Sequence, residues 1–154
     1  MAEYLRAIKS PDGGGEEVLS LEESRKRQEG QIHLQGEQTG WKQTREVIFG
    51  GEIFAGVPMI DIPKDPALER RFLLGFWEGA AEQINDHIIL TRGLSEEQRG
   101  GWKSVKQMID GRLRDAESAL EKGDTAKIDM SDVQDKINEL ARAAQEEDTV
   151  RMAA

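Results

Sequence analysis

Acidic side chains form the clearest candidate constellation in this sequence. Glu78, Glu82 and Asp86 recur every four residues, so on a helix their carboxylates would share one face. Metal sites in helical bundles use Glu-x-x-His pairs, and neither His33 nor His87 has a glutamate three residues before it. We therefore expect a solvated acidic stripe and no metal site.

Other catalytic patterns are also incomplete. Residues 36–42 read Gly-Glu-Gln-Thr-Gly-Trp-Lys, which has the outline of a phosphate-binding loop, but Trp41 separates the second glycine from Lys42. The chain has no cysteine, so a cysteine nucleophile, a disulfide and a thiolate metal site are excluded. The two histidines belong to no recognisable catalytic pattern. We therefore expect that the protein is not an enzyme and that it has no catalytic residue and no cofactor.

Tryptophan offers the best candidate for a contact residue. Trp77 and Trp102 fall on apolar stripes, which favours a role in the core. Trp41 lies in a polar stretch flanked by glycine, so we expect it to bind a partner, with Glu37 and Lys42 beside it. The alternative is that Trp41 caps a β region and contributes only to folding.

The charge balance limits the class of partner. The chain has 30 acidic and 21 basic residues, a net charge of −9, without a basic cluster. Such a chain is repelled by nucleic acid and by anionic membranes, so we expect a protein partner with a basic surface. The sequence has neither a secretory signal pattern nor an apolar stretch long enough to span a bilayer, and we expect a soluble, cytoplasmic protein.

Three segments carry helix signals. Pro66 after Asp65 suits a first helical position, while Ser95 and Ser131 each precede a glutamine by three residues, as in a capping box. Apolar residues at helical spacing follow each signal. The sequence predicts helices over 66–90, 96–122 and 132–146.

The residues before them favour a different structure. Short β-branched and aromatic runs broken by glycine and proline, such as Val47-Ile48-Phe49 and Ile53-Phe54, predict a small antiparallel β region over 31–62, with a hairpin at Gly50-Gly51. Residues 1–30 have no apolar stripe, so we expect a flexible or partner-ordered arm, with a short helix or linker that Gly30 closes. The predicted fold is α+β, with one domain over 31–154.

The end of the chain resembles the toxin-wrapping tail of ParD-type antitoxins. The resemblance rests on Leu113 to Gly123 and on Ile128-Asp-Met-Ser-Asp-Val133, followed by a charged helix. It implies a protein that neutralises a partner. The remainder departs from that family, because no ribbon-helix-helix strand precedes this tail.

Helices with clear N-cap signals and one apolar face, in a sequence without catalytic motifs, indicate a binding function. We expect a non-enzymatic inhibitor or adaptor that occupies a basic or apolar groove of a partner protein through a helix face and the region around Trp41. The alternative is a structural subunit of an oligomeric assembly, such as a virion or phage particle, in which the arm orders on a neighbour. A small enzyme without a recognisable motif is the third hypothesis.

Overall fold

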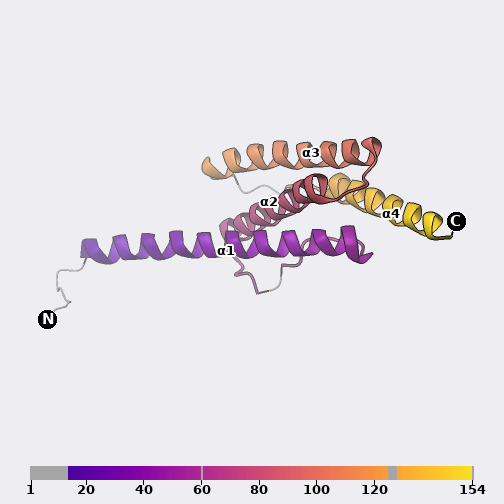
Figure 1. Ribbon diagram of the computed structural model, residues 1–154. Coiled ribbons are helices and arrows are strands. Elements are labelled where there is room, and N and C mark those ends of the chain that lie inside the picture. Colours follow the sequence, from indigo (N-terminus) through magenta and orange to yellow (C-terminus); the bar gives the residue numbers. More distant parts are fainter. Residues whose placement is uncertain (1–13, 60, 125–127, 154) are drawn as a thin grey trace. The chain divides into compact units, whose positions relative to one another are not determined.

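Four α-helices make up the regular structure of the described chain (Figure 1). The computed structural model describes residues 14–59, 61–124 and 128–153. The helices are α1 (Gly14–Gly50), α2 (Pro66–Leu90), α3 (Glu96–Glu121) and α4 (Ser131–Ala153). Because no strand occurs among these residues, the fold is all-α and the prediction of an α+β fold is wrong.

The chain divides into two compact units, with the boundary after Gln31. Within the first unit, α1 carries charges of both signs, and Arg25 pairs with Glu29 at 3.5 Å. Residues 1–13 of the predicted arm lie outside the described residues, and Gly30, which was expected to close a short helix, lies inside α1. The second unit contains the remainder of α1 and the other three helices, and all contacts below lie within it.

Residues 31–50, predicted as strands, are helical because their buried positions follow a helical period. These positions recur every three or four residues: Ile32, Gly36, Gly40, Thr44, Val47 and Ile48. Gly51, predicted as part of a hairpin, instead adopts a φ of +76° directly after the last residue of α1, which is the conformation that commonly ends a helix. The described residues from 51 to 62 form no strand.

The predicted starts of α2 and α3 are confirmed. The Asp65 carboxylate accepts hydrogen bonds from the first turn of α2, and Pro66 is the first helical residue. Ser95 and Gln98 form the full capping box of α3. At α4 the expected box is replaced, because Ser131 is already helical and its hydroxyl donates to Asp129 at 2.7 Å.

Helices α1 and α2 run parallel and pack backbone against backbone. A Cβ atom added to Gly40 would lie 1.9 Å from the Phe76 carbonyl oxygen, and one added to Gly79 would lie 1.9 Å from the Glu37 carbonyl oxygen. Only glycine permits such an approach. Two glycines on each helix make this contact, and each pair is four residues apart: Gly36, Gly40, Gly75 and Gly79.

The core of the second unit lies around α2. Its largest fully buried side chains include Trp77, Trp102, Phe72 and Phe76. Helix α3 contacts both α2 and α4. This packing confirms that Trp77 and Trp102 are core residues, and it fixes the surface of α2 that faces α1.

Candidate protein-interaction site

Side chains of α1 meet the acidic stripe of α2 along one edge of the helix pair. The Nε2 atom of His33 lies 3.0 Å from the Oε2 atom of Glu78. Two turns further along, the indole N–H of Trp41 donates to the Asp86 carboxylate at 3.4 Å. We call this row the polar seam: His33, Glu37, Trp41, Glu78, Glu82 and Asp86. The acidic stripe therefore serves partly as a set of partners for α1.

The middle of the polar seam is negatively charged. Although Glu82 is exposed, desolvation by its surroundings and the neighbouring carboxylates of Glu37, Asp86 and Glu78 raise its pKa. Desolvation first and like charges second disfavour the ionised form of Glu82, so a nearby cation would be favourable. Within the described chain, no group of three or more His, Asp or Glu side chains is arranged to hold a metal ion.

Trp41 begins a stack of side chains on α1. It is half-buried, and the Arg45 guanidinium carbon lies 5.4 Å from the centre of its ring system. The same guanidinium carbon lies 5.9 Å from the ring centre of Phe49. Both distances are within the range of cation–π attraction. The three residues are spaced four apart, so they line one face of the helix.

The stack ends against a buried histidine. The ring of His87 makes edge contacts with Phe49 and Trp102, with ring centres 5.3 Å apart in each case. Its Nδ1 atom lies 2.8 Å from the Thr91 hydroxyl oxygen. Burial, helped by the Arg99 charge, lowers the pKa of His87, so the neutral ring is favoured. A hollow of about 160 Å³ lies beside these rings.

Large apolar side chains are exposed at this end of the helix pair. Phe49 is 57 % exposed, and at the end of α2 Ile89 and Leu90 are 67 % and 74 % exposed. Leu90 follows Asp86 by one helical turn, so it continues the edge on which the polar seam lies. We call the following set the Trp41–Leu90 surface: Trp41, Arg45, Phe49, Ile89 and Leu90.

The sequence identified this surface only in part. Of the predicted contact residues, Trp41 lies on it, Glu37 lies in the adjoining polar seam, and Lys42 is exposed on α1. Sequence reasoning missed Phe49, which was assigned to a strand, and Leu90. One signal could have found Leu90: residues 88–90 are all apolar, and no single helix face buries three consecutive positions.

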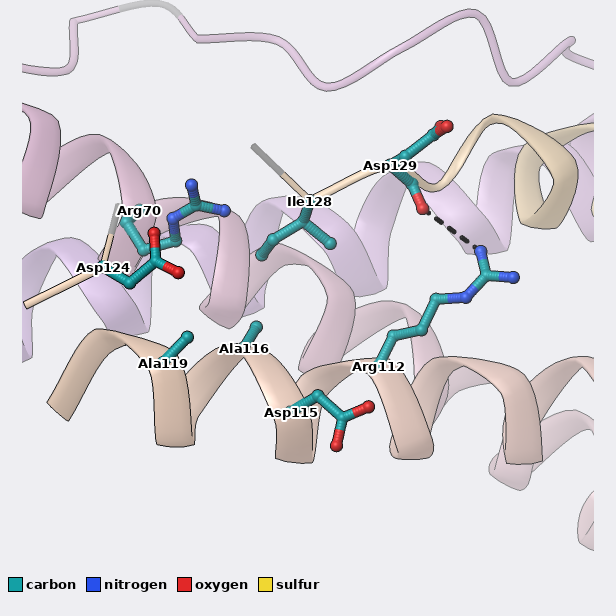
Figure 2. A pocket seen from close by; sticks show the side chains of 8 residues that line it. All are labelled: Arg70, Arg112, Asp115, Ala116, Ala119, Asp124, Ile128 and Asp129. Carbon is teal, nitrogen blue, oxygen red and sulfur yellow. Dashed lines mark hydrogen bonds between the residues drawn. The ribbon is translucent and has the colours of Figure 1, made fainter. Parts of the chain in front are cut away.

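A second hollow, of about 250 Å³, is lined by Arg70 of α2, by residues of α3 and by Asp124, Ile128 and Asp129 between α3 and α4 (Figure 2). Arg112 lines this hollow. The Arg112 guanidinium donates hydrogen bonds to both carboxylate oxygens of Asp132, at 2.5 and 2.6 Å, and to the Asp129 carbonyl oxygen at 3.2 Å. This hydrogen-bonded ion pair raises the pKa of Arg112 and lowers that of Asp132 to about 2. We interpret Arg112 as a structural clamp between α3 and α4.

Three comparisons with known proteins found no similar protein. No protein-family model, no curated protein and no solved structure matches the chain. Among the residues that the structure describes, no helix has the length and apolar character required to cross a membrane.

Proposed function

We propose that this protein is a non-enzymatic protein-binding module whose contact site is the Trp41–Leu90 surface. The observation that carries the proposal is the exposure of Phe49, Ile89 and Leu90 at one end of the α1–α2 pair. Exposed apolar groups that gather beside polar residues are typical of interaction sites. The aromatic and arginine content of the surface is also typical of binding hot spots.

The energy available to a partner can be estimated from exposure. Complete burial of a Leu, Ile or Phe side chain contributes roughly 1.5–3 kcal/mol. With exposed fractions of 57, 67 and 74 %, Phe49, Ile89 and Leu90 together leave roughly 3–6 kcal/mol to be gained on binding. Because association itself costs at least roughly 4 kcal/mol, this gain is one part of the binding energy, and the surrounding contacts must supply the remainder.

The adjoining charges favour a basic partner. Glu37, Glu82 and Asp86 lie next to Trp41, and besides desolvation the neighbouring carboxylates contribute to the raised pKa of Glu82. A Lys or Arg side chain of a partner would relieve that repulsion. The proposed partner therefore presents apolar anchor residues flanked by basic residues, and its association should slow as salt rises and screens the charges.

Selection from a random peptide display library tests this proposal. With the full chain as bait, the enriched peptides should combine apolar residues with Lys or Arg. Their binding should be lost in Leu90→Asn and kept in Leu34→Asn, because Leu34 is also an exposed leucine of a helix but lies outside the Trp41–Leu90 surface. Enriched peptides that are acidic, or that bind both variants equally, would contradict the proposal.

A further inference from the structure

The connection between α1 and α2 contains a segment that is held like a bound peptide. Residues 51–59 have no regular secondary structure, and within them Phe54 is only 2 % exposed although the preceding Ile53 is 76 % exposed. We call residues Gly51–Gly56 the strap. The strap therefore inserts one aromatic side chain into the core and leaves its neighbours outside.

Both the side chain and the backbone of Phe54 are recognised. The Asn138 side chain of α4 accepts a hydrogen bond from the Phe54 N–H at 2.7 Å and donates one to the Phe54 carbonyl oxygen at 2.9 Å. The Phe54 ring stacks on Trp77, with ring centres 5.4 Å and planes 11° apart, and makes an edge contact with Phe76. The Asn138 amide hydrogen-bonds only backbone groups, so this contact would accept an extended chain of any sequence. The rings of Phe76 and Trp77, in contrast, favour an aromatic side chain.

The two ends of the strap are turns at glycine, and each is held by one long hydrogen bond: the Glu52 N–H donates to the Glu46 carbonyl oxygen at 3.4 Å, and the Gln43 side chain donates to the Gly56 carbonyl oxygen at 3.4 Å. Gly51 and Gly56 have φ values of +76° and +135°, which glycine adopts at little cost. Between them only Phe54 is buried, and a hollow of about 500 Å³ is lined by Gly51, Glu52 and Ile53 of the strap and by residues 135–145 of α4. Segments with few buried apolar contacts open at lower free energy than the helices that surround them.

From these contacts we propose that the strap opens as a unit and that the site beneath it binds an extended segment of a partner protein through one aromatic side chain. The strap site consists of Phe76, Trp77 and Asn138. In this structure the strap itself occupies the strap site. A partner segment that replaces it must therefore provide the same groups, a Phe-like ring on an extended backbone. This inference is independent of the proposed function.

Native-state hydrogen exchange on the parent chain tests the opening. After correction for intrinsic rates, the Phe54 amide should exchange at least roughly 100-fold faster than the Trp77 amide, because it opens without global unfolding. Equal protection of the two amides would show that the strap is released only when the core unfolds, and the proposal would be overturned.

Peptide competition tests the site itself. A synthetic peptide with the sequence of residues 51–56 is added to the full-length Phe54→Ala variant, and a peptide with alanine in place of its phenylalanine is the matched control. The first peptide should raise the melting temperature and shift the NMR signals of the Asn138 side-chain amide, and the rise in melting temperature should disappear in Phe54→Ala/Asn138→Ala. If Phe54→Ala does not fold, the same titration is made with Phe54→Leu. No effect, or an equal effect of both peptides, would refute a site for an aromatic segment.

Discussion

The close contact between α1 and α2 predicts that the single methyl group added by Gly40→Ala destabilises the protein. Gly40→Ala would place a Cβ atom 1.9 Å from the Phe76 carbonyl oxygen, whereas ordinary contacts begin at 3.4 Å. The two helices would therefore have to separate by about 1.5 Å at this point. Because the obstacle is backbone and not a flexible side chain, rotation of a side chain cannot relieve it.

The expected loss of stability follows from two opposing effects. Overpacking of a well-packed interior typically costs about 1–3 kcal/mol. Because a clash with backbone cannot be relieved by rotation of a side chain, we take the upper end of this range, about 3 kcal/mol. The intrinsic helix propensity of alanine over glycine offsets about 1 kcal/mol. We expect the free energy of unfolding of Gly40→Ala to fall by about 2 kcal/mol.

Denaturant unfolding of two matched variants measures this effect. Gly100 is also helical, but a Cβ atom added there would meet no atom within 4 Å. Gly100→Ala should therefore raise the free energy of unfolding by about 0.5–1 kcal/mol. Opposite signs for the same chemical change would confirm the backbone contact. A Gly40→Ala variant as stable as the parent would contradict the close parallel packing of α1 on α2.

Three further predictions concern stability. Ile109→Ala and Ile137→Ala remove fully buried side chains, so each should lower the free energy of unfolding by roughly 2–4 kcal/mol in urea titrations, and parent-like midpoints would show that the buried faces are misplaced. The pKa of His87 is lowered from its ordinary 6.5, so the unfolded chain takes up this proton first and stability should fall as pH drops below 6.5; an NMR titration that gives His87 a pKa above 6.5 would contradict this. The pKa of Asp132 is about 2, so the stability that its pair with Arg112 contributes is complete above 3.8 and is lost as pH falls towards 2; Asp132→Asn should show a smaller loss over this range than the parent.

The last three helices were predictable because their signals are local. An N-cap side chain and the backbone that it satisfies lie within three residues of one another, so Asp65 and Ser95 mark the starts of α2 and α3 without knowledge of the tertiary structure. The start of α4 differs because Asp129, two residues before Ser131, competes for the capping role by accepting from the Ser131 N–H at 3.0 Å. Both serines look alike in the sequence, and only their neighbours separate them.

Helix α1 was not predictable in the same way, because its buried face lacks the apolar stripe by which helices are recognised. The central positions of that face are Gly36, Gly40 and Thr44, none of which has a large apolar side chain. Ile32 and Val47 remain visible only as short apolar runs, and these resemble strands. Glycine supplies the contact here through the absence of a side chain, so hydrophobic periodicity cannot detect it.

The same glycines determine whether the candidate site can form. On α2, Gly75 and Gly79 precede Glu78 and Glu82 by three residues, so the glycine row and the acidic row are neighbours on the helix surface. A close backbone contact at the first row brings α1 side chains within hydrogen-bonding distance of the second, as the Trp41–Asp86 contact at 3.4 Å shows. A separation of about 1.5 Å would break this long hydrogen bond. The acidic stripe was visible in the sequence, but its partners depend on an interhelical distance that only the glycine pairs reveal.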